Sequence, residues 1–154
     1  MYVHRPVLVA ALTSLVLAAI PAPAATVVRG DCPNGSGATE CTDAGTATIY
    51  LNAGADRFAL EHARGHLYDA QRLDDGERNK LKRLLGLPRS PWQTGTGVAG
   101  MDSPSERFAD AYAACRVKLD PEKSWAVAYD YNPSRREFRQ MCATIARAAD
   151  APTA

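Results

Sequence analysis

The sequence has few histidines and no excess of charge of either sign. It contains three histidines in 154 residues, and its 18 Lys and Arg side chains face 17 Asp and Glu. There is no basic block and no interleaving of basic with aromatic residues, so nucleic acid is not expected as a partner. The motif Gly-x-Ser-x-Gly and the P-loop are also missing, which argues against a serine hydrolase or a P-loop nucleotide-binding protein.

Only one long apolar run is present, and it lies at the start of the chain. Residues 7–20 are mostly Val, Leu and Ala, with Arg5 before them and Pro-Ala-Pro-Ala-Ala after them. This is the order of a secretory signal peptide. The run has about 14 residues, fewer than the roughly 20 that cross a bilayer. An uncleaved membrane anchor is the alternative. We predict that residues 1–24 are a signal peptide and that the protein is secreted, with no membrane association after cleavage.

Cleavage after Ala24 would leave one domain of ordinary size. Residues 25–150 are long enough to form a hydrophobic core, and residues 151–154 are expected to be a frayed tail. Because His4 and Arg5 leave with the signal peptide, basic and acidic residues become equal in number. The only histidines that remain are His62 and His66.

The four cysteines predict disulfides. An even number of cysteines in an exported chain favours disulfide bonds over free thiols. No Cys-x-x-Cys spacing occurs, which argues against a thiolate metal site. Three pairings are open, and short separation along the chain favours Cys32 with Cys41 and Cys115 with Cys142.

The pattern of residue types predicts a mainly α fold with a small β element, an α+β domain stapled by disulfides. Residues 25–45 are rich in Gly, Thr and Ser and are expected to be irregular, whereas the β-branched stretch 46–51 predicts a strand. Capping residues and apolar periodicity predict about four helices. Their approximate ranges are 56–73, 74–86, 103–118 and 134–149. The stretch 88–102, with Trp92, is a loop long enough to suggest a lid.

The two remaining histidines are four residues apart within the first predicted helix. Residues i and i+4 lie on one face of a helix, one turn apart, so both imidazoles can reach one metal ion. This geometry is the reason that zinc sites use His-x-x-x-His on a helix. The alternative is that His62 and His66 are two unrelated histidines on a solvated face.

Segment 59–69, Ala-Leu-Glu-His-Ala-Arg-Gly-His-Leu-Tyr-Asp, resembles the zinc-binding helix of the zincin metallopeptidases. The resemblance implies that His62 and His66 are zinc ligands and that Gly65 matches the glycine before the second histidine. Ala63 stands where zincins have the glutamate that takes a proton from zinc-bound water. Glu61 lies about 120° from the centre of the histidine face on the other side, so it is a poor substitute.

A third ligand is expected, because two histidines alone make a weak zinc site. Segment 105–112, Ser-Glu-Arg-Phe-Ala-Asp-Ala-Tyr, resembles the later helix of gluzincins, which implies Glu106 as the third ligand and Asp110 as the partner that orients a histidine. The alternative role of Glu106 is a capping box with Ser103. Asp69 lies on the same helix face as His62 and His66 and is a second candidate for a residue that orients a ligating histidine.

Three functional hypotheses follow. The first is a secreted zincin relative that keeps a His62/His66/Glu106 zinc site and has lost hydrolysis, or most of it, because Ala63 has no titratable group; a peptide or protein ligand is its expected partner. The second is an active zinc metallopeptidase that uses another base, and the third is a metal-free secreted structural or binding module. The sequence therefore leaves enzymatic activity open.

Overall fold

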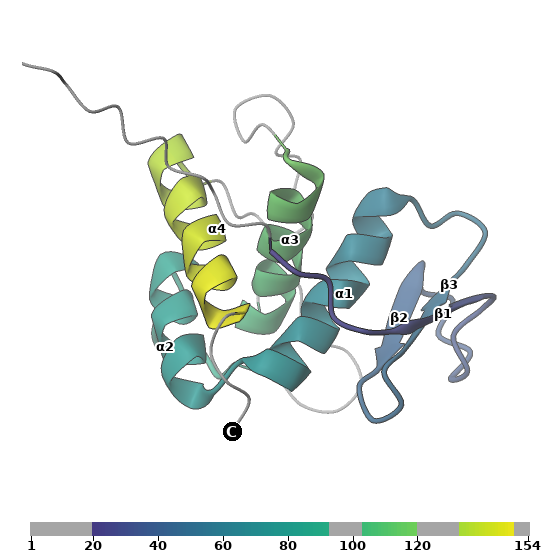
Figure 1. Cartoon of the computed structure of the whole chain (residues 1–154). Helices are drawn as coiled ribbons and strands as arrows, with labels where there is room; N and C mark the ends of the chain where they lie inside the picture. The colour runs from purple at the N-terminus through teal and green to yellow at the C-terminus, as the bar shows by residue number, and fades with distance from the viewer. Residues whose placement is uncertain (1–19, 93–102, 120–132, 150–154) are drawn as a thin grey trace, which may run out of the picture.

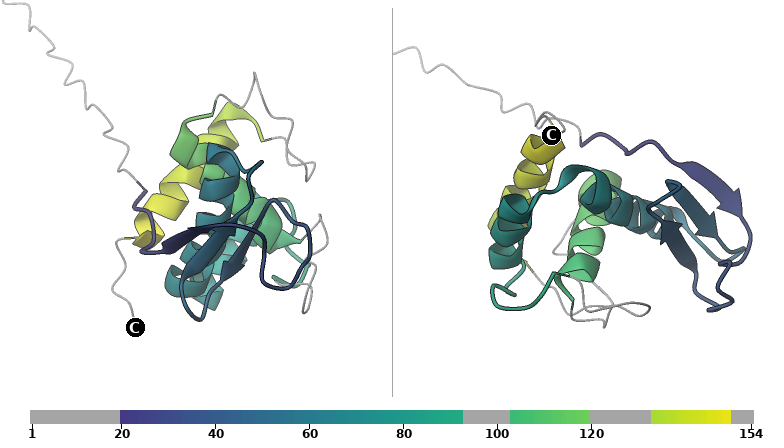
Figure 2. Two further views of the ribbon diagram at one scale, coloured as in Figure 1. Left: turned by 90° about the vertical axis from the view of Figure 1, so that its right-hand side faces the viewer. Right: turned by 90° about the horizontal axis from the view of Figure 1, so that it is seen from below.

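The computed structural model describes residues 20–92, 103–119 and 133–149, and it confirms a mainly α fold with a small sheet. Three short strands come first in the chain and four helices follow (Figure 1). Helix α1, Arg57–Arg72, lies between the sheet and the other helices, because it packs against β2 and β3 as well as α3. Figure 2 shows the sheet at one end of the molecule and the pair α2 and α4 at the other.

The sheet contains two strands that the sequence did not reveal. Strands β1 (Thr26–Arg29) and β2 (Glu40–Asp43) flank β3 (Thr48–Leu51), with β1 parallel and β2 antiparallel to it. The expectation that residues 25–45 are irregular is therefore wrong. All four residues of β1 are exposed, so this strand has no apolar alternation by which a sequence could disclose it.

Helix α1 is buried on two sides. Ala63 and Leu67 pack with Ile49 and Leu51 of β3 in a small apolar cluster between helix and sheet. Tyr68 belongs to the larger helical core on the other side. The Asp56 carboxylate accepts a hydrogen bond from the Ala59 N–H and caps the helix at its first turn.

The larger core is formed where α1 and α3 meet α2 and α4. Helix α2 spans Asp75–Leu84, α3 spans Pro104–Val117 and α4 spans Arg135–Ala149. The expected capping box of Asp74 and Glu77 starts α2. The Tyr68 hydroxyl donates to the Ile145 carbonyl and so joins α1 to α4 within this core.

Two disulfides staple the fold in the pairing that chain locality favours. Cys32 pairs with Cys41 of β2, and Cys115 of α3 pairs with Cys142 of α4. The first closes the loop that leads into β2. The second joins two helices whose connection, residues 120–132, lies outside the described residues.

The described part of the N-terminal segment lies against α3. Ile20 is buried, its carbonyl accepts a hydrogen bond from Arg116, and the Pro21 carbonyl accepts one from the Tyr112 hydroxyl. Residues 1–19 and 151–154, and most of the loop 88–102, fall outside the described residues. Among the helices that are described, none has the length and apolarity to cross a membrane.

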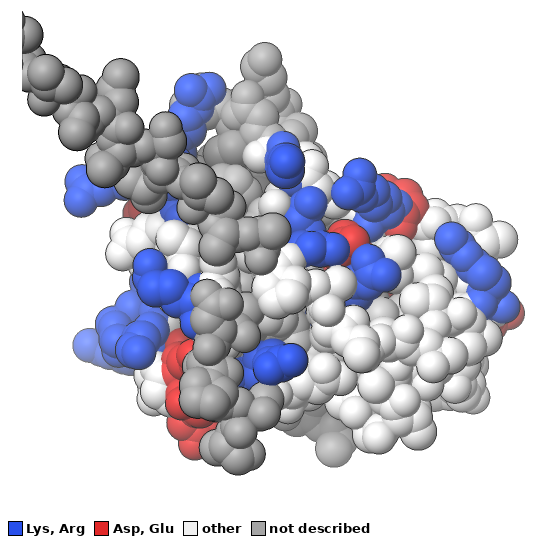
Figure 3. Space-filling view, in the orientation of Figure 1, with Lys and Arg blue, Asp and Glu red and all other residues white. Residues whose placement is uncertain are grey.

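Charge is distributed unevenly over the face seen in Figure 3. Lys and Arg side chains are scattered over the helices with Asp and Glu among them, and the area over the sheet is mostly uncharged.

Candidate metal centre

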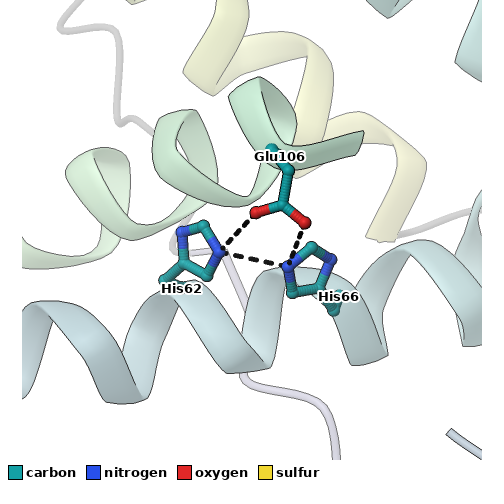
Figure 4. Close-up of side chains that lie close together, drawn as sticks. All are labelled: His62, His66 and Glu106. Atoms are coloured by element: carbon teal, nitrogen blue, oxygen red, sulfur yellow. Dashed lines mark hydrogen bonds and ion pairs between the residues drawn. The ribbon is translucent and has the colours of Figure 1, made fainter. Parts of the chain in front are cut away.

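The imidazole rings of His62 and His66 lie on one face of α1 with their Nε2 atoms close together, as the i, i+4 spacing predicts. Their Nε2 atoms are 3.1 Å apart (Figure 4). His62 is buried, with 5% of its surface exposed, and His66 is half-buried. The pair therefore faces the packed interior between α1 and α3, with His66 on the more open side.

Glu106 completes the group from α3. One carboxylate oxygen lies 3.2 Å from His62 Nε2 and the other lies 3.5 Å from His66 Nε2 (Figure 4). Two imidazole nitrogens and a carboxylate oxygen are a donor set that suits zinc. These three residues form a group that could hold a metal ion.

Glu106 lies in the first turn of α3, and its side chain does not complete the capping box that was the alternative role for it. Its backbone N–H donates to the Ser103 hydroxyl, so the residue takes part in capping α3. Its carboxylate turns to the two histidines. The backbone N–H of Glu106 is thus capped by Ser103, while its carboxylate is left to face the two histidines.

Asp110, one turn further along α3, holds the far side of the His62 ring. Its Oδ1 is 2.8 Å from His62 Nδ1, and both residues are buried. A carboxylate on Nδ1 fixes the ring orientation and leaves Nε2 to face a metal. The other carboxylate oxygen of Asp110 is buried and has no hydrogen-bond partner among the described residues.

Asp69 does not support the histidines, which corrects the prediction made from its place on their stripe. Its carboxylate accepts hydrogen bonds from Arg78 Nε and from Trp92 Nε1. Asp69 lies almost two turns beyond His62, where α1 has reached α2 and the start of the loop. Trp92 also packs on Phe108, so its side chain joins the helical core.

Glu61 is engaged away from the metal centre. Its two carboxylate oxygens accept from Arg64 and Arg116 at 2.7 and 3.1 Å. The side chain is buried in these ion pairs. This agrees with the helix geometry that makes Glu61 a poor substitute for the missing base.

Ala63 faces the sheet and is fully buried. Its side chain packs in the apolar cluster with Ile49 and Leu51 of β3. Its carbonyl accepts a hydrogen bond from the Thr42 hydroxyl of β2. The position at which zincins carry a glutamate is thus used in this chain for packing of the helix on the sheet.

Gly65 permits the close approach of α1 and α3 that brings Glu106 to the histidines. A Cβ at position 65 would lie 2.8 Å from the Ala109 Cα and 3.1 Å from its carbonyl oxygen. Any side chain here would push the backbone of α3 away. The glycine is therefore explained by helix packing directly beside the site.

The electrostatics of the group favour a charged histidine flanked by carboxylates. Burial would lower the pKa of His62, but its hydrogen bonds to Asp110 and Glu106 outweigh burial and raise that pKa to about 9. Although burial would raise the pKa of Glu106, hydrogen bonds to both histidines hold it far below its usual range. At neutral pH a metal ion must therefore displace a proton from His62.

A fourth residue, Glu40, lies beside the group and was not predicted. Its Oε1 is 4.0 Å from His62 Nε2, and burial raises the pKa of its carboxyl. Glu40 is the first residue of β2, in the Gly- and Ser-rich segment expected to be irregular. No helix spacing connects it to His62, so only the pairing of β2 with β3 and the packing of β2 on α1 could reveal it.

No protein-family model matches this chain, and no curated protein or solved structure matches it either. What the structure shows is coarser than a family: His62, His66 and Glu106 form a group that could hold a metal ion.

Proposed function

We propose that this chain is a secreted, zincin-like protein that binds zinc through His62, His66 and Glu106 and does not hydrolyse peptides at the rate of a working metallopeptidase. The observation that carries the proposal is the convergence of two imidazole nitrogens and one carboxylate from α1 and α3. Asp110 supports it, because an oriented imidazole is the usual accompaniment of a zinc-ligating histidine. The two disulfides support export.

The loss of hydrolysis follows from Ala63. A positioned general base contributes about 10²- to 10⁴-fold to the rate of such reactions. Neither Ala63 nor Glu61 can supply one, because the first has no titratable group and the second is held by Arg64 and Arg116. Restoring the base by Ala63→Glu would bury a carboxylate in the cluster with Ile49 and Leu51, so that variant is expected to be less stable rather than more active.

The test is the zinc content and zinc affinity of the purified protein with its disulfides intact. We expect about one zinc ion per chain for the wild type, and an affinity at least about 100-fold lower for His66→Ala and Glu106→Gln, since even outer partners of a site are worth 10- to 100-fold. Gln71→Ala is the matched control, because Gln71 is an exposed residue of the same helix.

Two results would contradict the proposal in different ways. A wild type that binds no zinc would favour a metal-free module. Zinc binding together with rapid hydrolysis of a peptide library, abolished by a chelator, would favour an active metallopeptidase with another base.

A further inference from the structure

Glu40 occupies the side of the metal centre that faces the sheet. His62, His66 and Glu106 come from two helices, whereas Glu40 comes from strand β2. Its side chain is 23% exposed and its Oε1 is 4.0 Å from His62 Nε2. The carboxylate is therefore partly withdrawn from solvent and lies near a nitrogen that the proposed zinc site uses.

We propose that Glu40 is the fourth protein ligand of this site, an inference that rests on the zinc binding proposed above. Ligand atoms about 2.0–2.1 Å from a tetrahedral zinc ion are roughly 3.3 Å from one another. His62 Nε2 is 3.1 Å from His66 Nε2 and 3.2 Å from Glu106 Oε2. It is 4.0 Å from Glu40 Oε1, which is within 1 Å of those two distances.

The Glu40 carboxylate, 4.0 Å from His62 Nε2, is close enough either for a ligand that moves onto the ion or for a base that acts through bound water. An oxygen about 2.6 Å from the oxygen of such a water can lie about 4 Å from a ligating nitrogen, so this distance does not separate the two roles. Glu40 lies outside the group of ligand atoms within 4.8 Å of one another, so direct coordination requires its side chain to move toward His66 and Glu106.

The backbone on both sides of Glu40 is fastened. The Thr39 carbonyl accepts a hydrogen bond from the Asn52 N–H, Cys41 is joined to Cys32, and the Thr42 hydroxyl donates to the Ala63 carbonyl of α1. Successive side chains of a strand point to opposite faces, so Glu40 and Thr42 share the face toward α1. The edge strand thus presents Glu40 to the site in a fixed position.

The charges also fit a zinc ion bound by these four residues. Two carboxylates and two neutral imidazoles leave a divalent ion with no net charge, which reduces the cost of burying it. A zinc ion with four protein ligands has no position left for a substrate or a reactive water, and this is the arrangement of structural sites. In this protein the ion therefore joins the sheet, α1 and α3, and the absence of a base at Ala63 has no consequence for its role.

The experiment compares zinc and cobalt binding by the wild type, Glu40→Gln and Asp43→Asn. Asp43 is an exposed carboxylate of the same strand whose contacts are with Gly45 and Thr46, so it controls for charge and for strand stability. We expect Glu40→Gln to lower zinc affinity at least about 100-fold. The visible absorption of bound Co²⁺ should change from that of a tetrahedral site with four protein ligands to that of a site with a water ligand. Asp43→Asn should match the wild type in both measurements.

The outcomes separate this inference from the proposed function. If the wild type binds no zinc, both fail. If it binds zinc and Glu40→Gln leaves the cobalt spectrum unchanged, Glu40 is only a neighbouring charge and the inference is overturned, while the three-residue site stands. Circular dichroism of each metal-free variant checks its folding, and Glu40→Ala is the second variant if Glu40→Gln does not fold; it must also change the cobalt spectrum.

Discussion

His62 lies between two carboxylates, and this position governs what the metal-free protein does as the pH changes. Asp110 contacts its Nδ1 at 2.8 Å and Glu106 contacts its Nε2 at 3.2 Å. Without a metal ion these bonds are best satisfied when the ring carries both protons. With a metal ion, Nε2 must lose its proton, and Asp110 alone holds the ring.

The metal-free protein should lose stability as the pH rises from 6.5 to 9. Hydrogen bonds to Asp110 and Glu106 raise the pKa of His62 to about 9 in the folded chain, against a usual value of 6.5. A raised pKa stabilises the folded state fully below the unfolded pKa, and that stabilisation disappears as the pH passes the folded pKa. The urea midpoint measured in the presence of a chelator should therefore be lower at pH 9 than at pH 6.5.

The stabilisation caused by zinc should change with pH in the opposite direction, because the ion and the proton compete for His62 Nε2. The increase in urea midpoint caused by zinc should grow between pH 6.5 and pH 9. The variant His62→Gln removes the titrating ring and should flatten the metal-free profile. A metal-free midpoint that rises with pH in the wild type would show that the carboxylates do not hold a protonated ring.

At the scale of the helices and strands, the contact of α1 with α3 determines whether the site can form. Gly65 and Ala109 touch directly, and Glu106 lies one turn before Ala109 on α3. A gap opened at this contact would move the Glu106 carboxylate away from both histidines.

Gly65→Ala should therefore destabilise the fold and weaken zinc binding together. In an open helix the change would stabilise by roughly 1 kcal/mol. Here the added Cβ would lie 2.8 Å from the Ala109 Cα, and overpacking of this kind costs about 1–3 kcal/mol. Chemical denaturation and a zinc titration measure the two effects.

Gly76→Ala is the control for this change. It lies in the first turn of α2, where a Cβ would meet only the Asp74 side chain at 3.1 Å. It should be close to neutral in stability and leave zinc affinity unchanged. A Gly65→Ala protein as stable as the wild type would mean that the two helices can separate without cost.

The helices and the strands differ in how much of them the sequence could predict. The apolar periodicity and the caps, such as Asp56 for α1 and Asp74 for α2, are local features, and the predicted ranges agree with the helices found. Strands β1 and β2 owe their structure to pairing with β3, which no local pattern expresses. Glu40 was missed for the same reason.

Within the site, the spacing of residues along the sequence predicted contacts correctly where both residues lie on one face of the same helix. The i, i+4 rule brought His62 and His66 together, and the same spacing on α3 placed Glu106 and Asp110 on one face. It failed for Asp69, because the side chain found partners in Arg78 and Trp92 that come from other segments. A helix stripe shows which residues can meet, and tertiary packing decides which of them do.

At the scale of the whole molecule, two cross-links act on different parts of the chain. Zinc would join α1 to α3 through His62 and Glu106, and the disulfide joins α3 to α4 through Cys115 and Cys142. The two attachment points on α3, Glu106 and Cys115, are nine residues apart, which is about 13 Å along a helix. The zinc site and the disulfide both use α3, but no residue belongs to both of them.

The stabilisation from zinc and from the second disulfide should therefore add. A ligand at about 1,000 times its Kd stabilises by roughly 4 kcal/mol, and a disulfide typically contributes about 2–4 kcal/mol. The measurement is the free energy of unfolding of the wild type and of Cys115→Ala/Cys142→Ala, each with zinc and with a chelator. Distant sites add within about 0.5 kcal/mol. A zinc effect that disappears in the disulfide variant would show instead that α3 takes its place beside α1 only when α4 is tied to it.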